Sequence, residues 1–133
     1  MKVVTTLLVL FFSLPAFTSD DLSGNKISCL YKSDSEIRLV GFHFTGKKVV
    51  NLYHEFHNIP LSITGHIYKT SSGEIHIYNI GNYEVANINR QTLFTKHDFN
   101  GRTYSYKDCK LIEGNIVKSF NQALKELKKL NKI

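Results

Sequence analysis

The sequence predicts an all-β domain that is followed by one amphipathic helix. Three observations support this: short runs rich in β-branched and aromatic residues, turn residues between them, and a change of hydrophobic period near the C-terminus. Every link between the runs is short, and short links join antiparallel neighbours. We therefore expect an antiparallel meander of about eight strands in a small closed or partly closed barrel, with a two-sheet sandwich as the alternative.

Residues 1–19 have the layout of a secretory signal peptide. Lys2 precedes the nearly uninterrupted apolar run 3–12, and small residues then lead into Asp20. The apolar run is shorter than the roughly 20 residues that a membrane-spanning helix needs. We expect export to the periplasm or the extracellular space, with residues 20–114 forming the β domain.

The β domain is divided into strands by turn signals. Asn100-Gly101 is a strong type I′ hairpin signal, and Gly81-Asn82 is a second two-residue turn. The run 49–56 also fits a helical period, but its Val-Val pair and short flanking turns favour a strand. In the last run the apolar parity changes, which a bulge at Lys107-Asp108 would explain. The predicted strands are 26–31, 36–44, 49–56, 61–69, 74–80, 83–88, 92–99 and 102–112.

The chain has two cysteines, Cys29 in the first predicted strand and Cys109 in the last. In an exported protein an even pair indicates a disulfide. Such a bond would close a loop of about 80 residues and stabilise the fold by roughly 4 kcal/mol. It would also bring the first and last strands together, which favours a closed sheet without exposed edges.

Residues 115–133 predict an amphipathic helix with Asn115 as its N-cap. Its apolar positions recur every three or four residues, at Ile116, Phe120, Ala123, Leu127 and Leu130. Its other face carries five lysines: Lys118, Lys125, Lys128, Lys129 and Lys132. We expect the apolar stripe to pack on the β domain, and the lysines either to be solvated or to contact an anionic membrane or an acidic partner.

The tripeptide His-Ile-Tyr occurs twice within residues 65–78. The separator 71–73 suits a three-residue hairpin loop with Gly73 in the left-handed conformation, and this loop would pair Tyr68 with His76. One face of the hairpin would then carry four polar rings: His66, Tyr68, His76 and Tyr78. We expect this candidate binding face to lie in solvent or, in a wide barrel, to line a ligand site.

No motif in the sequence specifies a reaction. His54-Glu55-Phe56-His57 lacks the His-Glu-x-x-His spacing of zinc proteases, because the second histidine comes one residue early. A metal held by His66 and His76 would lack a third ligand. Phosphate loops, dinucleotide fingerprints and nucleophile elbows are absent, and the β domain is close to neutral in charge. We therefore expect no catalysis, no metal, no cofactor and no nucleic-acid partner.

The predicted meander, terminal helix and barrel-closing cysteines resemble small exported β-barrels, including lipocalin-like folds and periplasmic lysozyme inhibitors. The resemblance is one of architecture, so it implies a fold and does not settle a function. We expect a non-catalytic exported binding protein for a small apolar ligand or a protein partner. The alternative is an envelope-associated protein that docks on anionic lipid through its lysine-rich helix.

Overall fold

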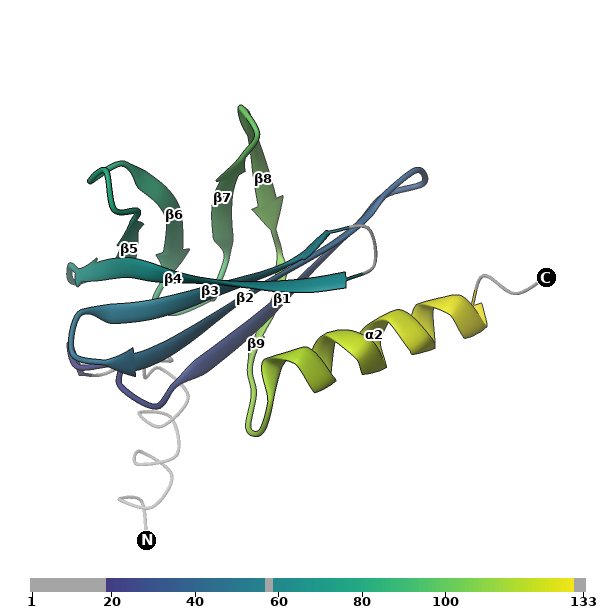
Figure 1. Ribbon diagram of the computed structural model, residues 1–133, viewed down its shortest axis with the longest axis horizontal. Coiled ribbons are helices and arrows are strands. Elements are labelled where there is room, and N and C mark those ends of the chain that lie inside the picture. The colour runs from purple at the N-terminus through teal and green to yellow at the C-terminus, as the bar shows by residue number, and fades with distance from the viewer. Residues whose placement is uncertain (1–18, 57–58, 131–133) are drawn as a thin grey trace, which may run out of the picture.

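The computed structural model describes residues 19–56 and 59–130. The elements are β1 (Lys26–Lys32), β2 (Ile37–Gly46), β3 (Val49–Phe56), β4 (Ile59–Thr70), β5 (Glu74–Tyr78), β6 (Glu84–Asn89), β7 (Thr95–Phe99), β8 (Arg102–Tyr106), β9 (Asp108–Leu111) and α2 (Ile116–Leu130). The nine strands form one antiparallel sheet in the order β8-β7-β6-β5-β4-β3-β2-β1-β9 (Figure 1). Because β8 and β9 are consecutive in the chain, the two ends of the sheet meet in a nearly closed barrel, which confirms the predicted meander.

The disulfide closes the barrel where its first and last strands meet. Cys29 of β1 lies directly opposite Cys109 of β9, and their sulfur atoms are bonded. The Oγ1 atom of Thr95 in β7 lies 3.6 Å from both sulfur atoms and donates a hydrogen bond to the Leu93 carbonyl. The predicted pairing of the two cysteines is therefore confirmed. The bond joins β1 to β9, and Thr95 of β7 lies against it.

The last predicted strand is divided into two at Lys107. Tyr104 and Tyr106 of β8 point into the barrel and pair with β7, whereas Cys109 belongs to β9 and pairs with β1. The parity change that suggested a bulge marks the position where the chain exchanges one partner strand for another. The Asn100-Gly101 turn has positive φ angles at both residues, as the predicted type I′ hairpin requires.

The β4–β5 hairpin has a shorter turn than expected. Ser71 N–H donates to the Glu74 carbonyl, so only Ser72 and Gly73 lie between the paired strand ends. Thr70 consequently faces Ile75, and the predicted three-residue loop is wrong by one residue. Since alternate residues point to opposite sides of a strand, this difference moves every side chain of β5 to the other face relative to β4.

One end of the barrel is filled by an apolar core and covered by the segment before β1. Leu22 is buried there, and its N–H donates to the hydroxyl of Tyr68. Arg90, which is 5% exposed, donates to the Asp20 carboxylate and to the carbonyls of Ser19 and Ser71. The fully buried core side chains include Ile27, Val40, Phe42, Phe44, Val50, Ile75, Ile77 and Ile88.

Helix α2 packs on the outer face of the barrel, alongside β1, β2 and β3 (Figure 1). The Asn115 side chain accepts a hydrogen bond from Lys118 N–H, which confirms the predicted N-cap. Ile116 and Phe120 are buried against Leu39, so the apolar stripe is used for packing. Within residues 19–56 and 59–130, no helix is long and apolar enough to cross a membrane.

Gly41 sets the distance between α2 and β2, and we expect its replacement to weaken the domain. A Cβ atom at Gly41 would lie 2.8 Å from Ile116 Cγ2 and 3.2 Å from Phe120 Cζ. Gly41→Ala should therefore lower the free energy of unfolding by about 1–3 kcal/mol through overpacking. Gly46→Ala is the matched control in the same strand, because its Cβ would meet nothing within 4 Å. Equal stability of the two variants in guanidinium denaturation would contradict this packing.

Candidate functional site at one end of the barrel interior

The two copies of His-Ile-Tyr lie on opposite faces of the sheet. Tyr68 pairs with Ile77 and Lys69 pairs with His76, so the polar rings of β4 share a face with the isoleucines of β5. His66 and Tyr68 are buried inside the barrel. The predicted checkerboard of four rings on one face is wrong, because the two-residue turn shifts the register by one.

The outer copy makes ordinary surface contacts. His76 Nδ1 lies 2.8 Å from a carboxylate oxygen of Glu84 and 3.1 Å from the side-chain nitrogen of Asn87. The ammonium of Lys69 lies 5.3 Å from the centre of the Tyr78 ring, within the range of a cation–π contact. His76 and Tyr78 are therefore partnered on the outside of the barrel, away from His66.

Three histidines lie inside the barrel, each directly opposite a buried core residue of a neighbouring strand. His54 of β3, His66 of β4 and His97 of β7 are 7%, 7% and 4% exposed. His97 is close enough to the other two for their charges to affect its pKa. The cluster is assembled from strands that are not all neighbours in the sheet, so it exists only in the closed barrel.

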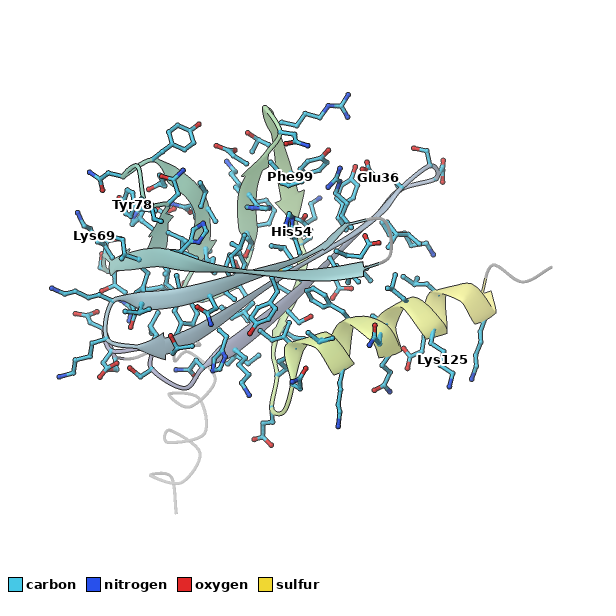
Figure 2. All side chains as sticks on the ribbon, in the orientation of Figure 1. Glu36, His54, Lys69, Tyr78, Phe99 and Lys125 are labelled. Carbon is cyan, nitrogen blue, oxygen red and sulfur yellow. A yellow bond between two sulfur atoms is a disulfide. The ribbon has the colours of Figure 1, made fainter. Side chains whose placement is uncertain are left out.

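Phe99 joins the histidine cluster from β7. Its ring centre lies 4.8 Å from that of His54 in an edge-to-face arrangement and 6.3 Å from that of His97 in a stacked one. β3 and β7 are separated by three strands in the sheet order, so the contact with His54 crosses the barrel interior. Figure 2 shows His54 and Phe99 close together, on the far side of the sheet from Lys125 of the helix.

Arg38 of β2 lies over two aromatic rings at the edge of the cluster. Its guanidinium carbon is 4.3 Å from the centre of the Tyr104 ring and 5.1 Å from that of Phe99. Its Nε donates to a carboxylate oxygen of Glu36 over 2.6 Å. The Arg38 side chain remains 24% exposed. It therefore lies between the solvent and the buried histidines.

Burial keeps the interior histidines neutral. Desolvation lowers the pKa of both His54 and His66 below the ordinary value of 6.5. For His97, burial in the first place and the neighbouring His54 in the second lower the pKa to about 4, although Asp98 opposes the shift. A neutral imidazole has one N–H donor and one acceptor nitrogen. At pH 7 the cluster therefore offers both donors and acceptors without adding charge.

Two of these imidazoles have a buried nitrogen without a partner. The Nδ1 atoms of His54 and His66 are buried and make no hydrogen bond within the described structure. Leaving a buried polar atom unsatisfied costs roughly 1–3 kcal/mol, and most such atoms in proteins find a partner. A bound molecule that reached this end of the barrel would meet two polar atoms ready to pair with it.

The chemistry of the cluster suits binding better than metal coordination. Among the described residues, no group of three histidine, cysteine or acidic side chains is arranged to hold a metal ion. His57, part of the sequence run considered for zinc, lies outside the described residues. Aromatic rings, a stacked guanidinium and neutral imidazoles can instead surround a small molecule with an apolar body and a few polar groups.

The described lysines of the helix are not part of this cluster. Lys118, Lys125 and Lys129 are exposed, and Figure 2 shows Lys125 pointing away from the sheet. The Lys128 side chain and Lys132 lie outside the described part of the chain. Contact between these lysines and anionic lipid stays a prediction.

The sequence contained one signal for the interior cluster. His54 follows Val50 and Leu52 at alternate positions of β3, and His97 lies between Thr95 and Phe99 at the same spacing. A histidine on the parity of buried neighbours is expected to face the core. The periodicity of each strand does not show which histidines lie near one another, because that depends on how the barrel closes.

Comparison of the chain with protein-family models, with curated protein sequences and with solved structures finds no match.

Proposed function

We propose that this protein is an exported, non-catalytic binding protein that takes a small, mainly apolar ligand into the end of the barrel containing His54, His66 and His97. One observation carries the proposal: among the residues that the structure describes, the buried Nδ1 atoms of His54 and His66 have no hydrogen-bond partner. A ligand that hydrogen-bonds to them offsets the cost of burying them unsatisfied.

The surroundings of the histidines suggest the chemistry of the ligand. The rings of Phe99 and Tyr104 both lie within cation–π distance of the Arg38 guanidinium, so aromatic and cationic groups adjoin here. A planar, mostly apolar molecule can stack on such groups, and a polar or acidic group on it can reach Arg38 or an imidazole nitrogen. The expected ligand is therefore a planar apolar compound with one or two hydrogen-bonding groups.

The disulfide supports an oxidising compartment. Bonds such as Cys29–Cys109 form and persist in the periplasm and outside the cell, and they are rare in the cytosol. Together with the predicted leader in residues 1–19, this favours export.

Anilinonaphthalene sulfonate is a suitable probe, because it has planar apolar rings and one acidic group. We expect saturable binding by the folded protein and at least fivefold weaker binding by His66→Leu, since a lost hydrogen bond costs about 1 kcal/mol. His76→Leu is the matched control, because it removes the histidine of the outer copy of the same tripeptide. Fluorescence titration measures both affinities, and near-ultraviolet circular dichroism verifies that each variant is folded.

The paired variants separate interior from surface binding. Two results would contradict a binding site inside the barrel. One is binding of the dye to His66→Leu and His76→Leu with the wild-type affinity. The other is binding to the folded protein that does not saturate. Arg38→Met provides a second comparison, because it removes the cation that stacks on Phe99 and Tyr104. We expect a loss of affinity of about tenfold for the acidic dye.

A further inference from the structure

The barrel is not hydrogen-bonded along the whole of its seam. β9 pairs with β1 only from Ile27 to Leu30. On that side, Tyr31 and Lys32 have no strand partner within residues 19–56 and 59–130. β8 pairs with β7 and, within the described backbone, with no other strand. Figure 1 shows β8 and β1 diverging from the point where β9 begins. A free strand edge therefore lies on each side of this opening.

Tyrosine rings fill the inner side of the seam. The ring centre of Tyr31 lies 5.9 Å from that of Tyr104 and 6.2 Å from that of Tyr106, edge to face in both cases. These contacts hold β1 near β8 without using their backbone groups. The N–H and C=O groups of the two edges are therefore left for water or for an added strand.

Two adjoining pockets make a groove along the outside of the seam. The first has a volume of about 360 Å³ and includes Tyr31, Lys32, Ser105 and Lys107 in its wall. The second, of about 330 Å³, lies between α2 and the sheet. Both pockets are lined by Leu30 and Asp108, so one leads into the other.

The two parts of the groove differ in chemistry. The seam pocket has two exposed lysines, Lys32 and Lys107, against one acid, Asp108. The pocket beside the helix has an apolar part made by Leu30, Leu39, Ala123 and Leu127. The rest of its wall is polar and consists of Ser28, Asp108, Lys110, Ser119, Gln122 and Glu126. An occupant that matches both parts has an acidic group at the seam and an apolar group next to the helix.

We propose that this groove binds an extended segment of a protein partner by strand addition at the β8–β1 seam. The backbone of the segment pairs with the free strand edges, which supplies affinity. An acidic side chain of the segment lies near Lys32 and Lys107, and an apolar side chain enters the pocket beside α2. The walls of both pockets contain none of the three interior histidines, so the groove is a different site from the histidine cluster. Tyr104 contacts both Tyr31 at the seam and Arg38 beside the cluster.

Selection from a displayed library of random heptapeptides tests the groove without a known partner. Enriched peptides are expected to carry an acidic residue near an apolar one and to bind Lys107→Glu about fivefold more weakly than the wild type. Lys47→Glu is the matched control, since Lys47 is exposed in the turn between β2 and β3 and lines neither pocket of the groove. Its affinity should stay within twofold of the wild type.

Backbone pairing is tested with the best enriched peptide and a copy of it that is methylated at alternate amide nitrogens. We expect only the unmethylated peptide to shift and protect the amide signals of β8 and of Tyr31 and Lys32 in nuclear magnetic resonance spectra. Failure to enrich any peptide, equal binding of both copies, or shifts confined to another surface would overturn the proposal. Dimerisation that protects the same amides would also overturn it, because the occupant would then be a second copy of the chain.

Discussion

Lowering the pH from 7 to 4 is expected to reduce the free energy of unfolding by about 3 kcal/mol through His97 alone. Its pKa is about 4 in the folded protein, against 6.5 as the ordinary value. Below pH 6.5 the unfolded chain takes up the proton first, so stability that is present above this pH is lost as the pH falls towards 4. His54 and His66, whose pKa values are also lowered by burial, add to the loss in the same direction.

The contribution of His97 is isolated by comparing variants at each pH. We expect His97→Leu to show a weaker dependence of unfolding free energy on pH between 7 and 4 than the wild type. His76→Leu, which changes a histidine on the outer face, should keep the wild-type dependence. Urea denaturation at a series of pH values measures the difference. Parallel curves for the wild type and His97→Leu would show that the interior histidine is not responsible.

Removal of the disulfide is expected to cost about 4 kcal/mol. The bond between Cys29 and Cys109 closes a loop with a sequence separation of 80 residues, and chain entropy predicts an effect of this size. β9 is only four residues long, so its register against β1 depends strongly on the bond. We expect Cys29→Ala/Cys109→Ala to lose amide protection first in β9 and in the adjoining part of β1.

Two measurements test the role of the disulfide. Guanidinium denaturation of the double variant gives the change in stability, and hydrogen exchange locates it. Reduction of the wild type with dithiothreitol serves as the control, because it breaks the bond without changing either residue to alanine. If neither treatment moves the unfolding midpoint, the bond does not secure the closure of the barrel.

Much of the fold could be predicted because its signals are local. The Asn100-Gly101 turn, the alternating strands and the Asn115 cap each depend on a few neighbouring residues, and all three are confirmed. The cysteine pair added one long-range constraint, which identified the strands that meet. The sequence also indicated an irregularity at Lys107-Asp108, because the apolar residues change parity there. The structure shows that the irregularity is a division into two strands, β8 and β9.

The register of the β4–β5 hairpin could not be predicted from its own turn. Ser71-Ser72-Gly73 suits a loop of either two or three residues, and the two choices place His76 on opposite faces. The structure has the shorter loop, with Arg90 bound to the carbonyls of Ser71 and Gly73. Arg90 comes from a distant turn, so local sequence did not contain this information. The interior histidine cluster was missed for a similar reason, since its members meet across the barrel.

The crystal structure of residues 20–133 with bound anilinonaphthalene sulfonate tests the proposed binding site most directly. We predict that the dye stacks on Phe99 beside Arg38, and that Nδ1 of His54 or His66 lies about 3 Å from a polar atom of the dye or from a water bound to it. A dye that lies only on the outer face, with both Nδ1 atoms still without partners, would contradict a binding site inside the barrel.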